Sequence, residues 1–107
     1  MKITHEQIEI CERHDWTVHI EDGDIWIESW SPAGENLVYE IYEDEGFVGS
    51  IKRLAADFDA DEHAEMWVAG RGKNGVPSSI RELVDDADAI DKMLQDLASA
   101  LADTEEE

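Results

Sequence analysis

A chain of 107 residues is long enough for one hydrophobic core and too short for two, so we expect a single domain. Hydrophobic residues make up 42% of the sequence and include four tryptophans, which excludes a disordered chain despite the high charge. The 28 acidic residues outnumber eight basic ones and give a net charge of −20, which disfavours direct binding to nucleic acid or to an anionic membrane.

The cysteine count and the hydropathy of the sequence indicate the cellular compartment of the protein. Cys11 is the only cysteine, so an intramolecular disulfide and a cysteine-based zinc cluster are both excluded. No segment approaches the roughly 20 apolar residues of a membrane-spanning helix, and residues 1–6 lack the apolar stretch of a signal peptide. We therefore expect a cytoplasmic protein.

The first expected element is a short helix over residues 5–14. Thr4 and Gln7 have the spacing of a capping box, in which each side chain binds the backbone N–H of the other residue. Ile8 and Cys11 give this helix one apolar edge.

A β-hairpin is expected next. Apolar and polar residues alternate from Trp16 to Ile20, which is the period of a half-buried strand. Asp22 and Gly23 are typical of a two-residue hairpin turn. Pairing across this turn places two apolar pairs on one face: Ile20 with Ile25, and Val18 with Ile27.

A third strand, from Leu37 to Glu43, completes a three-stranded antiparallel meander in which we set Ile27 opposite Ile41. Alternation assigns Trp16, Val18, Ile20, Ile25, Ile27, Tyr39 and Ile41 to the core face. It assigns His19, Trp26, Glu28, Trp30, Val38, Glu40 and Tyr42 to the opposite face. A small monomer rarely exposes so much aromatic surface, so we expect a helix to cover Trp26, Trp30 and Tyr42, with homodimerisation or a partner contact as the alternatives.

The second half of the chain has helical periodicity. One helix presents an apolar face made of Phe47, Ile51, Leu54 and Phe58. Asp59 and Glu62 cap the next helix, which carries Ala64, Trp67 and Val68 and ends near Gly70. The loop over residues 71–77 contains Arg71 and Lys73 but lacks the Gly-Lys-Ser/Thr ending of a P-loop, so we expect a plain connection.

The last helix is the most strongly patterned element. Ser79 and Glu82 form a second capping box, and an apolar seam with heptad spacing follows. The seam consists of Ile80, Leu83, Ala87, Ile90, Leu94, Leu97 and Leu101. The carboxylates outside the seam are expected to point outward: Asp85, Asp86, Asp88, Asp91 and Asp96.

The predicted fold is therefore α+β: a short N-terminal helix, a three-stranded antiparallel meander, and three helices of which the last is long. We expect residues 1–101 to form one acidic domain. Residues 102–107 are expected to form a disordered acidic tail, because they contain little to bury.

Three segments come close to known site motifs. Residues 57–61 begin like a calcium-binding EF-hand loop, but Glu62 replaces the required glycine and Val68 replaces the bidentate glutamate. His5 and His63 begin the zincin and deaminase patterns, whose remaining ligands are missing. We therefore predict no metal, no cofactor and no catalytic site, and we expect that the protein is not an enzyme.

Two segments carry a resemblance to other sequences. Residues 58–67 read FDADEHAEMW, and residues 75–87 read GVPSSIRELVDDA. Through these segments, and over most of its length, the chain resembles small acidic proteins of mobile elements and phages in gut Clostridia. That family has no assigned function, so the resemblance implies only an accessory role on a mobile element, such as counter-defence.

These patterns lead to two main hypotheses. In the first, carboxylates imitate phosphates and occupy the nucleic-acid-binding surface of a basic protein, since a domain of this size spans about 20 phosphate charges of duplex DNA. In the second, the aromatic face or the heptad helix docks a protein partner or a second copy of the chain, and acidity serves solubility and steering. Acidity as an adaptation to high salt is a third hypothesis. Under the first two hypotheses the candidate contacts are the acidic residues Asp85, Asp88, Asp91, Asp96, Glu28 and Glu40, and the aromatic residues Trp26, Trp30 and Tyr42.

Overall fold

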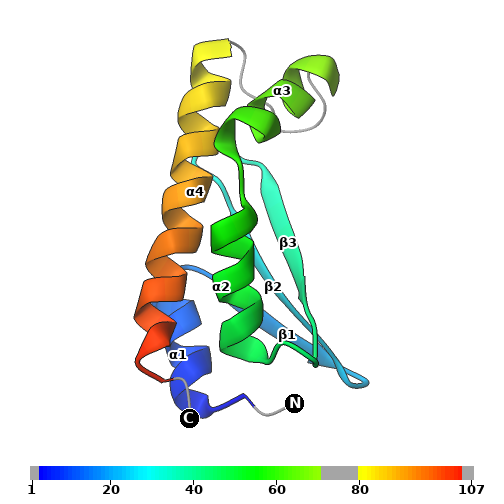
Figure 1. Ribbon diagram of the computed structural model, residues 1–107, viewed down its shortest axis with the longest axis vertical. Helices are drawn as coiled ribbons and strands as arrows, with labels where there is room; N and C mark the ends of the chain where they lie inside the picture. The colour runs from blue at the N-terminus through cyan, green and yellow to red at the C-terminus, as the bar shows by residue number, and fades with distance from the viewer. Residues whose placement is uncertain (1–2, 71–79, 105–107) are drawn as a thin grey trace.

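The computed structural model describes the backbone of residues 3–70 and 80–104, and the side chains of this part except those of residues 67–70 and 80–81. The elements follow in the order α1 (His5–Arg13), β1 (Thr17–Glu21), β2 (Asp24–Trp30), β3 (Asn36–Ile41), α2 (Phe47–Asp57), α3 (Ala60–Gly70) and α4 (Ile80–Ala102). This order confirms the predicted α+β fold with its antiparallel meander β1–β2–β3. In Figure 1, helices α1, α2 and α4 form one layer and the sheet forms the second.

A capping box begins α1, as the spacing of Thr4 and Gln7 predicts. The Gln7 N–H donates to Thr4 Oγ1 over 3.1 Å, and the Thr4 N–H donates to Gln7 Oε1 over 3.0 Å. Gln7 Nε2 also donates to Thr104 Oγ1 over 3.1 Å, which joins α1 to the residues just beyond α4. Cys11 lies on the buried side of α1, and burial raises the pKa of its thiol to about 12.

The β1–β2 hairpin has the predicted register. Val18 lies opposite Ile27, and the next apolar pair of the prediction also forms. Asp22 and Gly23 make the turn with φ angles of 51° and 88°. A type I′ turn requires this left-handed conformation at both central residues, which Asp and Gly tolerate better than bulkier residues.

The predicted register of β3 is wrong by two residues. Ile41 lies opposite Ile25 rather than opposite Ile27. The cause is a tight connection between β2 and β3, in which the Ser31 N–H donates to the Glu35 carbonyl over 2.9 Å and the Glu35 N–H donates to Ser31 Oγ over 3.0 Å. A shift by two residues leaves every side chain on its predicted face.

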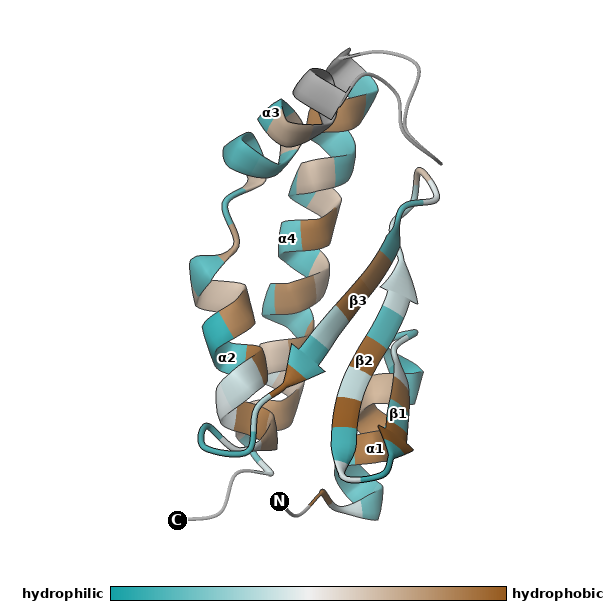
Figure 2. Cartoon of the chain, turned by 90° about the vertical axis from the view of Figure 1, so that its right-hand side faces the viewer, coloured by the Kyte–Doolittle hydropathy of each residue, from teal (hydrophilic) through white to brown (hydrophobic). Residues whose placement is uncertain are grey.

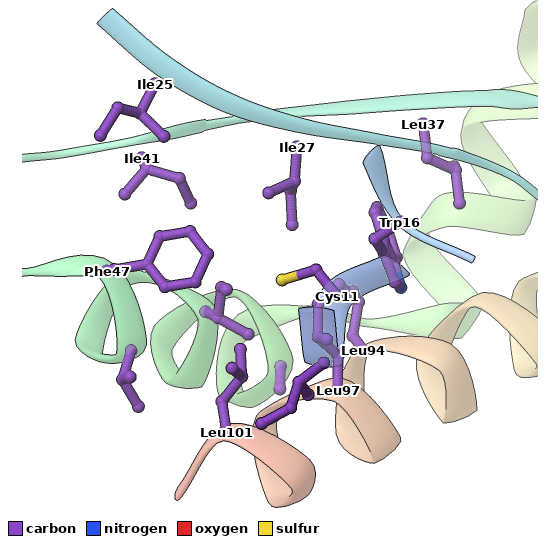
Figure 3. Close-up of a cluster of buried hydrophobic side chains, with 14 of the residues drawn as sticks. Cys11, Trp16, Ile25, Ile27, Leu37, Ile41, Phe47, Leu94, Leu97 and Leu101 are labelled. Carbon is purple, nitrogen blue, oxygen red and sulfur yellow. The ribbon is translucent and has the colours of Figure 1, made fainter. Parts of the chain in front are cut away.

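The hydrophobic core lies between the sheet and the helices. In Figure 3, side chains from the sheet side point toward those of the helices. The sheet side contributes Trp16, Ile25, Ile27, Leu37 and Ile41, and the helices contribute Cys11, Phe47, Ile51, Leu94, Leu97 and Leu101. None of these side chains is more than 6% exposed.

Ile20 is an error in the predicted core, because its side chain is 55% exposed. It lies on β1, an edge strand, close to the tip of the hairpin. Figure 1 shows the tip of this hairpin projecting away from the helices, so none of the described helices covers the tip. Val18 and Tyr39, which were also assigned to the core face, pack against the core and are partly buried.

The heptad seam of α4 is confirmed wherever its side chains are described: Leu83, Ala87, Ile90, Leu94, Leu97 and Leu101 are each at most 7% exposed. Asp86 contradicts the expectation that it points outward, since it is only 6% exposed. Its carboxylate lies on the flank of the seam and accepts from Ser31 Oγ over 2.6 Å and from the Ala33 N–H over 2.8 Å. These two hydrogen bonds offset the cost of burying the charge.

The cap of α3 is also confirmed, because the Glu62 N–H donates to Asp59 Oδ1 over 3.1 Å. Phe58 terminates α2 as its C-cap residue instead of extending it.

Several predictions lie outside the described residues: the side chains of Trp67, Val68 and Ile80, the loop over residues 71–77, the Ser79 cap, and residues 105–107 of the expected tail.

The second face of the sheet is not covered by any helix among the described residues. In Figure 2, α1 lies behind the strands and α2 and α4 lie to the left of β3, so none of these helices crosses in front of the sheet. The expected helical cover over Trp26, Trp30 and Tyr42 is therefore wrong. The reason is that α1, α2 and α4 all bury their apolar sides in one core with the inner face of the sheet, while α3 packs its Ala64 against α4.

Candidate interaction surface

The uncovered side of the sheet combines acidic and aromatic residues. We call it the outer face and define it by the strand residues that point away from the helices: Thr17, His19, Glu21, Asp24, Trp26, Glu28, Trp30, Asn36, Val38 and Glu40. Four of these side chains are carboxylates, and His19 is the one that can become cationic. The structure thus brings the predicted Glu28 and Glu40 onto the same surface as Trp26 and Trp30.

Two large apolar side chains of the outer face are exposed. Trp30 is 61% exposed and Val38 is 52% exposed, while Trp26 on the central strand is half-buried. Single exposed apolar residues are common, whereas a group of them on one surface with a polar rim is typical of a binding surface.

Neighbouring side chains fix the position of the Trp26 ring. His19 stacks on the indole with ring centroids 5.2 Å apart and an interplanar angle of 14°. His19 Nε2–H donates to Glu28 over 2.9 Å, and Asn36 Nδ2–H donates to the other oxygen of the same carboxylate over 2.9 Å. The hydrogen bond from Asn36, followed by that from His19, holds the pKa of Glu28 below its ordinary value.

A shallow hollow of about 320 Å³ opens beside Trp26, lined by Asp24, Trp26, Val38 and Glu40. Val38 and Glu40 come from β3, whereas His19 comes from β1 on the other side of β2. The hollow therefore lies on the side of the indole that faces away from His19. Asp24 was not among the residues predicted for this surface, although its place two residues before Trp26 in the same strand was a usable signal.

Tyr42 lies at the border of the outer face, just after the end of β3, and is 49% exposed. The guanidinium of Arg53, from α2, lies 5.8 Å from the centre of the Tyr42 ring. Arg53 Nε–H also donates to the Glu45 carboxylate over 2.7 and 2.8 Å. Tyr42 is thus part of an intramolecular cation–π contact, which sequence spacing does not predict because Arg53 belongs to α2 and Tyr42 follows β3.

The predicted acidic residues of α4 do not form one uniform row. Asp85 and Asp88 are exposed and have no ion pair among the described residues. Asp96 pairs with Lys92 over 2.8 Å, and Asp91 accepts from Gln95 Nε2 over 3.2 Å. Two of the four carboxylates are therefore engaged within the helix itself.

The connection between β2 and β3 is held in place by long-range contacts that the sequence did not predict. Asp86 of α4 binds it from one side, as described above. From α3, His63 Nε2–H donates to Glu35 Oε1 over 2.8 Å, and both side chains are less than 20% exposed. Burial, and to a smaller extent the charge of Glu35, raises the pKa of Tyr39 to about 12. These contacts fix the segment that directly follows Trp30.

Within residues 3–70 and 80–104 there is no group of three or more His, Cys, Asp and Glu side chains that could hold a metal ion. The helices of the described part include none that is both long and apolar enough to cross a membrane. No family model matches the chain, and no curated protein and no solved structure matches it either.

Proposed function

We propose that this chain is a non-catalytic interaction protein that binds a basic surface of a protein partner through the outer face of its sheet. The observation that carries the proposal is the exposed group around Trp26, Trp30 and Val38, which no helix of the described part covers. Tryptophan is enriched at the energetic centres of protein interfaces, because its large ring excludes water over a wide area.

Charge favours a basic partner over a second copy of the chain. The described part contains 25 of the 28 acidic residues and five of the eight basic residues, so it carries the same net charge of −20 as the whole chain. Two outer faces brought together would place like charges opposite one another, which is unfavourable. A basic surface would instead be attracted over a distance and would associate faster.

The proposal is tested by comparing three baits in a nuclease-treated extract of the host cell. The first is the wild-type chain, and the second is Trp30→Ala/Val38→Ala, which removes exposed apolar surface from the outer face. The third is the matched control Met66→Ala/Val84→Ala, which removes apolar side chains that are 66% and 39% exposed elsewhere.

We expect the same protein to bind the wild-type and control baits and to be lost from the outer-face variant. With the purified partner, the outer-face variant should bind about tenfold more weakly or worse, which is the usual cost of truncating a central interface residue. Equal retention by all three baits would show that the outer face is not the contact surface.

Mimicry of nucleic acid is a second candidate, favoured by the charge density of the molecule. A net charge of −20 along a longest axis of 43 Å corresponds to about one charge per 2 Å, close to the ~1.7 Å of duplex DNA. Under this candidate, replacing Asp85, Asp88, Asp91 and Asp96 with Asn weakens binding and flattens its salt dependence, and nucleic acid competes with the chain for the partner. The Trp30→Ala/Val38→Ala change would then have little effect.

A further inference from the structure

The hollow beside Trp26 has a particular chemical character, because an aromatic ring and two carboxylates line it together. Asp24 and Glu40 both line the hollow, and neither forms an ion pair or a side-chain hydrogen bond among the described residues. The indole supplies an electron-rich surface, and Val38 supplies an apolar wall. A ligand that fits this site is cationic at one end and has an apolar stem.

Other classes of ligand fit less well. A divalent metal ion requires about six oxygen ligands, whereas the lining supplies two carboxylates. A nucleobase could stack on Trp26, but its phosphates would be repelled by Asp24, Glu40 and the remaining charge of the molecule. A purely apolar side chain would leave both carboxylates unpaired at the rim of the contact.

The molecule contains one example of the arrangement that a cation would form here. At the border of the outer face, Arg53 lies over the ring of Tyr42 while its guanidinium binds the Glu45 carboxylate. The hollow presents the same two components, an aromatic ring and carboxylates, but none of the described residues that line it is a cation. By contrast, a second hollow of about 480 Å³, beside Glu9 and Glu12 on α1, already includes Arg13 in its lining.

We propose that the hollow binds an arginine side chain of the partner protein, an inference that rests on the proposed function and names the chemistry of its contact. The planar guanidinium stacks on the indole of Trp26 and donates hydrogen bonds toward Asp24 and Glu40, while its methylene groups lie against Val38. Lysine is a poorer ligand, because its ammonium group is compact, strongly hydrated and unable to stack.

The surrounding contacts prepare this site before a ligand arrives. His19 occupies the opposite side of the indole, and Glu28 and Asn36 hold His19 in place. A ring that is already fixed loses little further freedom when a ligand stacks on it, which improves binding. His19 is therefore a positioning residue for Trp26.

The inference is tested by NMR titration of the full chain with N-acetyl-arginine amide, using the Trp26 indole N–H and the Val38 and Glu40 amides as reporters. We expect saturable shifts at these positions with a dissociation constant on the order of millimolar, typical of a ligand of this size. N-acetyl-citrulline amide, which is neutral but nearly the same shape, should cause no saturable shift. N-acetyl-lysine amide should bind more weakly than the arginine probe.

Two double variants distinguish the effect of the carboxylates that line the hollow from the effect of the net charge of the molecule. Asp24→Asn/Glu40→Gln should weaken arginine binding about three- to tenfold, as expected for the loss of two exposed ion pairs. Asp61→Asn/Glu65→Gln removes the same two charges from exposed positions on α3 and should leave the affinity unchanged. Equal affinities for both variants, absence of a saturable shift, or tighter binding of the lysine probe would each overturn the inference. The proposed function would survive any of these results if capture of the partner still depended on Trp30 and Val38.

Discussion

Asp86 shows how one buried carboxylate can join parts of the chain that are distant in sequence. It belongs to α4, yet both of its oxygens accept hydrogen bonds from the connection between β2 and β3. The Ser31 hydroxyl that donates to Asp86 also accepts from the Glu35 N–H, so the loop and the helix share one hydrogen-bond network. Hydrogen bonds to a charged acceptor are stronger than those between neutral groups.

We predict that Asp86→Ala lowers the free energy of unfolding by about 2–4 kcal/mol, because it leaves the Ser31 hydroxyl and the Ala33 N–H without their acceptor. Urea denaturation measures this loss. Asp85→Ala, at the exposed neighbouring position, should change stability by no more than about 0.5 kcal/mol. Similar losses in both variants would mean that Asp86 does not stabilise the loop.

Tyr39 should make the protein sensitive to alkali. Its pKa is raised from 10.0 to about 12 in the folded protein, so the fold favours the neutral phenol. The contribution of the neutral phenol to the free energy of unfolding is fully present below pH 10. It is lost as the pH rises through about 12, because Tyr39 ionises in the unfolded chain at a lower pH than in the folded protein. Cys11 also makes the folded protein less stable at high pH, since the pKa of its thiol rises from 9.0 to about 12 on folding.

The titration of Tyr39 can be followed by phenolate absorbance in a Tyr42→Phe variant, in which it is the remaining tyrosine. We expect a midpoint near 12 or a rise that coincides with unfolding measured by circular dichroism. Glu35→Gln should lower the midpoint, because it removes a negative charge that raises this pKa. A midpoint near 10 in protein that is still folded would contradict the burial of Tyr39.

At the scale of elements, α4 holds the molecule together. It has 23 residues and contributes Ile90, Leu94, Leu97 and Leu101 to the main core, while its first half packs against α3. Figure 1 shows it running along the full length of the helical layer. None of the described helices supports the sheet on its other side, so the described strands pack against this single layer of helices.

We predict that Leu97→Ala lowers the free energy of unfolding by about 2–5 kcal/mol, since the side chain is fully buried and its removal leaves a cavity. Ser99→Ala, at an exposed position of the same helix, is the control and should change stability by less than about 0.5 kcal/mol. Thermal and urea unfolding measure both. An unchanged melting temperature for Leu97→Ala would show that the seam is not packed as described.

At the scale of the whole molecule, the dominant feature is an excess of negative charge on an elongated body. The principal extents are 43, 27 and 24 Å, and the net charge is −20. Like charges held this close oppose the compact state, because unfolding moves them apart. Among the described residues, the ion pairs of Lys92 and Arg53 are at least partly exposed and relieve little of this repulsion.

We predict that stability rises as sodium chloride increases from about 0.05 to 0.5 M, because screening shortens the range of the repulsion. The midpoint of urea unfolding should move to higher urea in wild type and should move less in Asp85→Asn/Asp88→Asn, which removes two carboxylates that form no ion pair among the described residues. Asp96→Asn is a useful comparison, since it also breaks the pair with Lys92. A midpoint that falls with added salt would show that attractive pairs outweigh the repulsion.

Local patterns in the sequence determined most of the fold. The capping box of Thr4 and Gln7, the Asp22-Gly23 turn and the heptad seam each depend on residues within a few positions of one another, so periodicity and turn chemistry were sufficient to predict them. The same alternation correctly placed Trp26 and Trp30 on one face together with Glu28 and Glu40. The aromatic and acidic character of the candidate site was therefore readable before the structure.

Tertiary structure decided which face of the sheet remained open and which charges were buried. Four helices appeared sufficient to cover both faces, but α1, α2 and α4 share one core, which leaves Trp30 and Val38 exposed. Asp86 is buried, and Arg53 reaches Tyr42, through contacts between elements far apart in the chain. Spacing within one element cannot reveal such contacts, because the packing of elements depends on the combined burial of all their apolar surfaces.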